Sequence, residues 1–235
     1  AAEGSVFQNQ QLRQALAGIA RENADVPSSG LYAAAKGLVP EGLTVDGLDY
    51  RETAGDPLPT IPEPKALYLA ARQGMATPDF SRVTLLLPKN AGLSELADQI
   101  NSAWQKECSL FFSVEEVEQD EFDARIAAGK YTIALAPIRA EGGSVYQMLQ
   151  QFTAEGGGLT GWSDPIYSQR LAESAQQTGS ARCALLADCE RQLLEGCAVV
   201  PLLGQNRRLL VADGITGLVF DPFTPVLDLT DAQKN

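Results

Sequence analysis

The stretch RVTLLLPKNAGLSELADQINSAWQKECSLFFSVEEVEQDEFDARIAAGKYTIALAPIRAEGG, residues 82 to 143, decides the fold. Three apolar runs within it are typical of buried strands, namely Val83 to Pro88, Leu110 to Val114 and Tyr131 to Pro137. After the first run, apolar residues recur at steps of three and four, which is one face of a helix: Leu93, Leu96, Ala97, Ile100, Ala103 and Trp104. Alternating strands and helices predict an α/β fold, with helices flanking a parallel or mixed sheet.

The segment from Arg139 to Gly143 follows the third predicted strand directly. Ligands of open α/β sheets bind just beyond the carboxyl ends of the strands. The sequence therefore predicts a ligand-binding edge at this segment. The acidic run from Glu115 to Asp123 could hold paired carboxylates for acid–base chemistry, but acidic residues are also favoured where a helix begins. We interpret that run as a solvated strand end and helix start.

The rest of the chain predicts helices over residues 8 to 23, 63 to 73 and 145 to 152, with Asn9 capping the first. Two more helices should begin near Asp164 and Ser180, and the second should end at Gly196. Residues 199 to 203 and 208 to 211 predict strands. Residues 24 to 64 are dense in proline and glycine, so we expect an irregular segment there, either a functional excursion or a surface wrap.

Composition excludes several classes of function. The net charge of −12 and a pI near 4.5 argue against binding nucleic acid or anionic membrane surfaces. The absence of histidine removes Ser-His-Asp and Cys-His catalysis and the commonest zinc ligand. We therefore assign no catalytic residue, no metal ligand and no cofactor.

The four cysteines form no CxxC pair. We expect buried free thiols, with a disulfide involving Cys108 as the alternative. No run of about 18 apolar residues predicts a membrane span. The opening residues AAEGSV have neither the basic nor the apolar region of a signal peptide.

Six segments carry a resemblance to a known family. In chain order they are LRQALAGIARE from Leu12, PKALYLAARQG from Pro64, the long unit from Val83 to Ile138, GWSDPIYSQRLAESA from Gly161, ARCALLADCERQLLEGCAVVPLL from Ala181 and ADGITGLVFDPFTPVLDL from Ala212. Together they resemble the carboxyl-terminal lobe of the extracellular solute-binding proteins (family 5) of the oligopeptide, dipeptide and nickel type. These proteins are the receptors of ABC importers.

The resemblance implies the second lobe of a two-lobed, type II periplasmic-binding-protein-like fold, in which two lobes close on a solute by a hinge. Residues 1 to 235 would form that single lobe, with 1 to 6 as a linker or an added segment. Residues 212 to 235 would form a tail that returns to a first lobe outside this sequence. The implied protein is exported, either periplasmic or lipid-anchored, and is not an enzyme. Its implied partners are a peptide or similar small solute, the ABC permease and the first lobe, without nucleic acid.

The resemblance also implies where the solute binds. The family's contact segment, usually "W..Dy.dP", corresponds here to APIRAEGGSVY, which lacks both the tryptophan and the aspartate. Arg139 could bind a solute carboxylate and Glu141 an amino group, or both could be solvated loop charges. Trp162 could line the cleft or simply pack. The candidate binding residues are Arg139, Ala140, Glu141, Gly142, Gly161 and Trp162.

A ligand-sensing lobe of a transcription regulator built on the same binding fold is the alternative function. The sequence upstream of Ala1 would separate the two interpretations, since a receptor needs a signal segment and a regulator needs a DNA-binding head.

Overall fold

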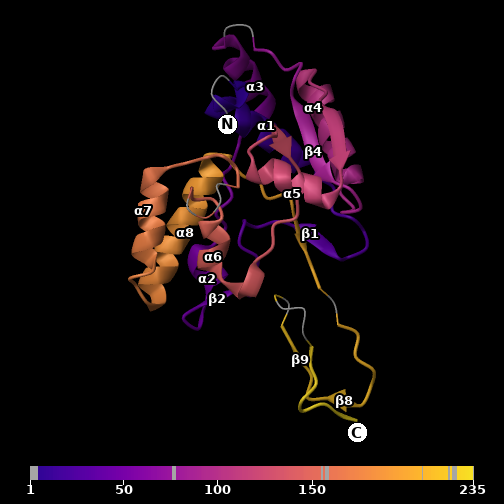
Figure 1. Ribbon diagram of the computed structural model, residues 1–235, viewed down its shortest axis with the longest axis vertical. Helices are drawn as coiled ribbons and strands as arrows, with labels where there is room; N and C mark the ends of the chain where they lie inside the picture. The colour runs from indigo at the N-terminus through magenta and orange to yellow at the C-terminus, as the bar shows by residue number, and fades with distance from the viewer. Residues whose placement is uncertain are drawn as a thin grey trace.

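The computed structural model describes residues 5–75, 78–154, 156, 159–207, 209–221, 223 and 227–234. It consists of an α/β part, a helical part packed beside it, and a carboxyl-terminal arm that extends away from both (Figure 1). The arm is defined here as residues 209–234. The fold is mixed α/β, as the sequence predicts.

The α/β part is built on a parallel three-stranded sheet in the order β5-β4-β6. Its strands are β4 (Thr84–Pro88), β5 (Ser113–Val117) and β6 (Ile133–Ala134), and Leu86 pairs with both Glu115 and Ala134. The connecting helices are α4 (Ser94–Cys108) and α5 (Gln119–Ala127), while α1 (Gln10–Asn23) packs against α3 (Pro64–Gln73) and α4. Strand β4 is buried on both faces, which explains its unbroken apolar sequence.

Two side-chain contacts fix how α4 sits in this part. The indole Nε1 of Trp104 donates to the carbonyl of Leu16 at 2.9 Å, which ties α4 to α1. Asn101, almost fully buried, donates its amide to the carbonyl of Phe112 at 2.7 Å and accepts from the Phe112 N–H at 2.9 Å. The backbone of Phe112 is therefore satisfied by a side chain instead of by strand β4.

The helical part packs α2 (Tyr50–Ala54), α6 (Val145–Gln150) and α7 (Pro165–Ser174) around α8 (Gly179–Glu195). A hairpin of β2 (Thr44–Val45) and β3 (Leu48–Asp49) completes it. Much of its core comes from residues 38 to 54, so the proline- and glycine-rich segment is a wrap around this part. The buried residues of that segment are Leu38, Val39, Leu43, Val45, Tyr50 and Ala54.

Glu190 lies at the centre of the helical part with no exposed surface. Its carboxylate accepts from the backbone N–H groups of Leu38 and Val39 at 2.8 and 2.9 Å and from the Tyr50 hydroxyl at 2.9 Å. The Arg51 guanidinium forms an ion pair with it at 3.1 Å. Burial and the neighbouring Glu190 carboxylate raise the pKa of Tyr50 far above its usual range, which keeps the phenol protonated as a donor.

Contacts between segments distant in sequence help to join the two parts. Strand β1 (Tyr32–Ala34) pairs antiparallel with β7 (Leu203–Gln205). The Arg13 side chain of α1 donates to the carbonyl of Gly196 at 2.9 Å, just after α8 ends. A cation at a helix carboxyl terminus satisfies orphan carbonyls and complements the helix dipole.

All four cysteines are buried and free. Burial raises the pKa of the Cys108 and Cys197 thiols to about 11 and that of Cys189 to about 12, and it also raises the pKa of Cys183. The expectation of buried free thiols is confirmed, and Cys108 forms no disulfide.

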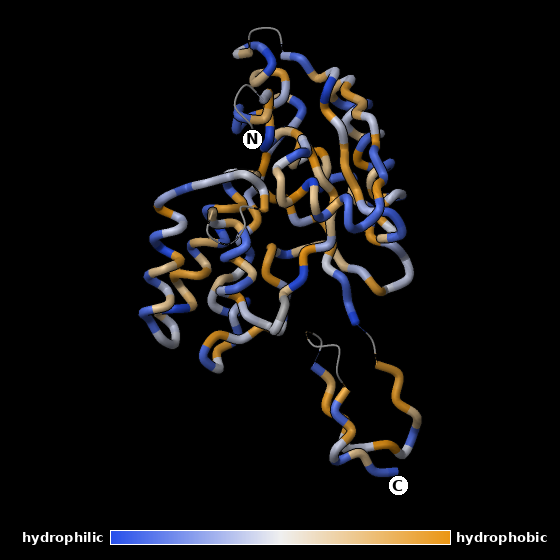
Figure 2. Tube along the Cα trace, viewed as in Figure 1, coloured by the Kyte–Doolittle hydropathy of each residue, from blue (hydrophilic) through white to orange (hydrophobic). Residues whose placement is uncertain are grey.

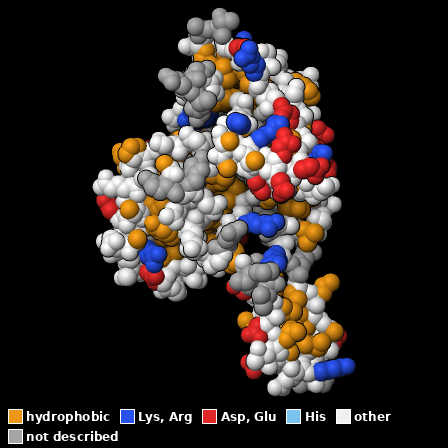
Figure 3. Space-filling model, viewed as in Figure 1, with side chains coloured by type: hydrophobic (Ala, Val, Ile, Leu, Met, Phe, Trp, Pro, Cys, Tyr) orange, Lys and Arg blue, Asp and Glu red, His pale blue; other side chains and the backbone are white. Residues whose placement is uncertain are grey.

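The arm is an irregular stretch followed by one long hairpin, in which β8 (Ile215–Thr216) and β9 (Val219–Phe220) face β11 (Gln233–Lys234) and β10 (Leu227–Asp228). Apolar side chains run along it, as the hydropathy colouring and the space-filling view show (Figures 2 and 3). Leu210 is 96% exposed, Val219 60% and Leu229 57%, so most of this apolar surface has no cover in the structure.

Several predicted boundaries were wrong. The second strand begins at Ser113 instead of Leu110, because Asn101 takes the backbone groups of Phe112. The third strand is confined to Ile133–Ala134. Helix α8 begins at Gly179, so Ser180 lies inside it and does not cap it. Residues 209 to 211 form no strand, and Arg208 lies outside the described residues. No described helix has the length and hydropathy needed to cross a membrane.

Candidate functional site

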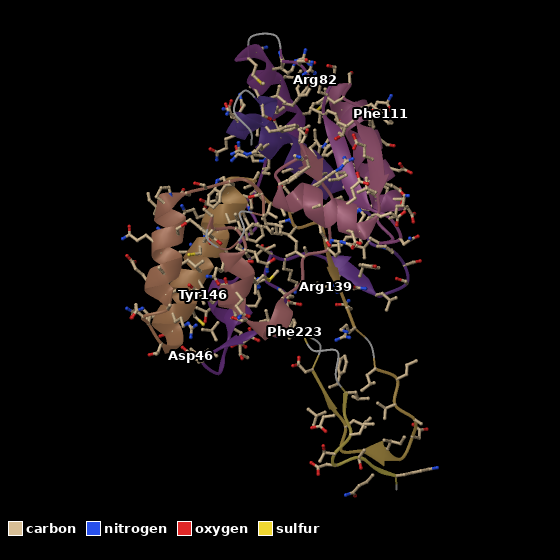
Figure 4. All side chains as sticks on the ribbon, viewed as in Figure 1. Asp46, Arg82, Phe111, Arg139, Tyr146 and Phe223 are labelled. Atoms are coloured by element: carbon tan, nitrogen blue, oxygen red, sulfur yellow. The ribbon has the colours of Figure 1, made fainter. Side chains whose placement is uncertain are left out.

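The loop from Leu135 to Ser144 links the cores of the two parts. At its start, the Leu135 N–H donates to the Leu86 carbonyl at 2.8 Å, which extends the pairing of β6 beyond its last residue. Farther along, Ile138 and Ala140 pack against the core of the helical part. The predicted binding segment therefore crosses from the carboxyl edge of the sheet to the helices (Figure 4).

The carboxyl edge of the sheet carries a self-contained charge pair. The Lys89 N–H donates to the Val117 carbonyl at 2.8 Å, and the Lys89 Nζ meets Glu118 at 2.8 Å. The carboxylate raises the pKa of the Lys89 ammonium, through its hydrogen bond first and its charge second. This lysine and glutamate therefore form a surface ion pair with each other.

Arg139 differs from Lys89 in having no such partner. Its side chain is exposed, and among the described residues none forms an ion pair or hydrogen bond with it. Figure 4 places it on the face between the body of the molecule and the arm. A guanidinium presents five donors in a planar fork that fits a carboxylate, so Arg139 can accept an anionic group without first breaking a bond to any described residue.

The rest of the segment turns sharply. Gly142 and Gly143 have φ values of 64° and 66°, which favour glycine. They belong to the short 3-10 helix η2 (Glu141–Gly143), after which Ser144 caps α6 by accepting from the Gln147 N–H at 3.3 Å. The side chain of Glu141 lies outside what the structure describes, so its predicted contact with an amino group stays a prediction.

Phe223, at the tip of the arm, packs against this segment from the other side. A Cβ placed on Gly143 would lie 3.8 Å from the Cβ of Phe223, and one on Gly42 would lie 3.8 Å from the edge of its ring. Leu43, which is buried, would be 3.6 Å from the Gly143 position. We call the surface formed by Gly42, Leu43 and Gly143 the glycine seat.

Trp162, the second predicted position, packs against the helical core. Its ring meets Tyr167 edge to face with centroids 5.2 Å apart, and its indole nitrogen lies beside Gly196. Gly161 precedes it with a φ of 61°. Within the described residues, no hydrogen bond or ring contact joins Trp162 to the Arg139 loop. Arg139, Ala140 and Gly142 thus lie on one loop, and Ala140 and Trp162 both pack against the core of the helical part.

A surface hollow of about 590 Å³ lies elsewhere, between the ends of α1, α3 and α4, where Glu22, Glu63 and Leu69 line it. None of the predicted binding residues lies in it. No pattern in the sequence predicts the glycine seat. The proline- and glycine-rich composition around Gly42 predicts only an irregular segment, either a functional excursion or a surface wrap.

No protein-family model matches this sequence. No curated protein matches it either. Solved structures do match. The pheromone receptor PrgZ, solved with its mode of peptide binding, has a TM-score of 0.74 and 18% identity, over 100% of this chain and 47% of its own.

The substrate-binding domain of an oligopeptide ABC transporter from Bacillus anthracis str. Ames gives a TM-score of 0.73 at 17% identity, over 98% of this chain and 46% of its own. A third match, a peptide-binding protein of a peptide ABC transporter, has a TM-score of 0.72 and 19% identity, covering 86% of this chain and 94% of that one. This chain thus spans about half the length of the first two structures.

These likenesses show the fold, which is that of peptide-binding proteins of ABC transporters, with a lobe of the type II periplasmic-binding-protein-like class. The resemblance drawn from the six sequence segments is confirmed at the level of the fold.

Proposed function

We propose that this chain is the carboxyl-terminal lobe of an exported peptide-binding protein, which captures peptides between two lobes and delivers them to an ABC permease. The arm would then return to the other lobe, and the protein would act without a cofactor or a chemical step. Residues 139 to 143 would form this lobe's share of the peptide site.

The observation that carries the proposal is the exposed guanidinium of Arg139, which pairs with none of the described residues, on a loop that follows the carboxyl end of β6. The structures that share the fold include a pheromone receptor solved with its mode of peptide binding, the substrate-binding domain of an oligopeptide transporter and a peptide-binding protein. Every peptide with a free carboxyl end carries a carboxylate there, and an exposed arginine is suited to it. The apolar surface of the arm is exposed, which supports the proposal that a neighbouring lobe covers it in the whole protein.

The test compares Arg139→Gln with Arg82→Gln by NMR titration of the ¹⁵N-labelled chain, using tripeptides with a free carboxylate or a carboxamide end. Both arginines are exposed, and Arg82 lies far from Arg139, just before β4 at the opposite edge of the sheet (Figure 4). We expect Arg139→Gln to weaken binding of the free carboxylates about tenfold, the worth of a charge-assisted hydrogen bond. Carboxamide binding should stay unchanged.

Arg82→Gln removes the same charge and should bind both peptide forms like the unsubstituted chain. If both substitutions weakened peptide binding equally, the loss would come from the change in net charge, and Arg139 would have no specific role. Peptides that produce no shift at millimolar concentration would contradict the assignment of residues 139 to 143 as this lobe's share of the peptide site.

A further inference from the structure

The glycine seat has the shape of a shelf for a flat apolar group. Two of its three residues lack a side chain, and their φ values of 87° at Gly42 and 66° at Gly143 keep larger residues out. The phenyl ring of Phe223 lies over Gly42, while its Cβ faces Gly143. Leu43, only 2% exposed, closes the inner side of the shelf.

Phe223 is a weakly held occupant of this seat. Among the described residues of the arm, it is the one that packs against the core of the helical part. Its N–H bonds within the arm, to the Asp221 carboxylate at 2.8 Å. A two-stranded hairpin is marginally stable in water, so an arm with little other apolar contact can release the ring at small cost.

The seat and Arg139 share one short segment, because Gly143 belongs to the same loop as the free guanidinium. A carboxyl-terminal residue of a peptide carries both complementary groups, a carboxylate for the arginine and a side chain for the shelf. Aromatic and large aliphatic side chains match the shelf, since the groups that meet Phe223 there are the Cα positions of two glycines and the apolar side chain of Leu43.

We propose that the glycine seat is a subsite for an aromatic or large aliphatic carboxyl-terminal side chain of a bound peptide, and that Phe223 occupies it as an intramolecular competitor. This inference rests on the proposed peptide-binding function. The competition has a simple consequence for affinity. If Phe223 fills the seat nine-tenths of the time, the apparent affinity for such a peptide falls about tenfold.

The test titrates ¹⁵N-labelled chain with Ala-Ala-Phe and with Ala-Ala-Ala, following the backbone amides of Gly42 and Gly143. Phe223→Ala should bind Ala-Ala-Phe about tenfold more tightly than the unsubstituted chain, with little change for Ala-Ala-Ala. Phe223→Leu keeps an apolar occupant and should stay close to the unsubstituted chain. Phe220→Ala is the matched control, because Phe220 lies in the hairpin on β9 and is not among the residues packed on the helical core.

A purely structural role for Phe223 predicts weaker or unchanged binding on its removal, so an increased affinity separates the two explanations. Equal affinities of Phe223→Ala and the unsubstituted chain for Ala-Ala-Phe would overturn the subsite and leave peptide binding standing. Tighter binding by Phe220→Ala to the same degree would also overturn it, because general loosening of the arm would then be the cause. Absence of binding by both peptides to all four proteins would reject a peptide site on this lobe together with the subsite.

Discussion

At the scale of single residues, the buried ion pair of Glu190 and Arg51 holds the wrap onto α8. Glu190 accepts from two backbone N–H groups, a phenol and a guanidinium, and Arg51 also donates to the Val39 carbonyl. We expect Arg51→Ala to lower the free energy of unfolding by about 3–5 kcal/mol, because it leaves a buried carboxylate without its counter-charge. Urea denaturation of the two proteins measures the difference.

The double substitution Arg51→Ala with Glu190→Gln is the control. The amide keeps an acceptor for the N–H groups of the wrap and removes the uncompensated charge, so the double variant should regain part of the loss. A double variant no more stable than Arg51→Ala would show that packing, and not charge, holds this site.

At the scale of elements, the β2–β3 hairpin caps α8 from a distance. Asp46 and Gly47 form its turn with φ values of 50° and 82°, as expected of an Asp-Gly hairpin turn. The Asp46 carboxylate accepts from the Gly179 N–H at 2.8 Å and pairs with Arg182 at 3.1 Å. Asp46→Ala should cost about 1–2 kcal/mol by thermal denaturation, through the lost cap and a φ that alanine resists.

Asp46→Asn keeps an acceptor oxygen for the Gly179 N–H, and asparagine tolerates a positive φ in such a turn. It should therefore lower the free energy of unfolding by about a few tenths of a kcal/mol. Equal losses from the two substitutions would assign the effect to the charge of the Arg182 pair.

How far the sequence predicts these elements depends on whether the deciding contacts are local. Helix α1 and its Asn9 cap follow from neighbouring residues, and the Leu12 N–H indeed donates to Asn9 at 3.0 Å. The start of α8 was wrong because its first N–H is satisfied by Asp46, which is distant in sequence. The loop from Leu135 to Ser144 could be located because it follows a strand, and its role in binding stays a prediction. The seat was missed because it joins Gly42, Gly143 and Phe223 from three separate segments.

At the scale of the whole molecule, the arm contributes little to the body of the lobe. Its apolar residues are largely exposed. A chain ending at Ala212 should melt within a few degrees of the full chain by calorimetry, since loss of the Phe223 contact removes about 1–2 kcal/mol. Light scattering should show fewer oligomers, because exposed apolar hairpins promote association.

If the truncated chain no longer unfolded cooperatively, the body would depend on the arm, and the expectation that the arm contributes little to its stability would be wrong. The matched variant is Phe223→Ala in the full chain, which should reproduce the change in melting temperature without reducing oligomer formation.

In an oxidising compartment, where we propose that this protein works, folding must compete with oxidation of the four cysteines that the folded structure buries. Once folded, each cysteine is shielded and its raised pKa keeps it out of the reactive thiolate form. Before folding, all four are exposed, and disulfides form there within seconds to hours. A newly exported chain must therefore bury α8, which carries Cys183 and Cys189, before an oxidant reaches it. Slow-folding variants should accumulate as wrongly bridged species even where their folded state is stable.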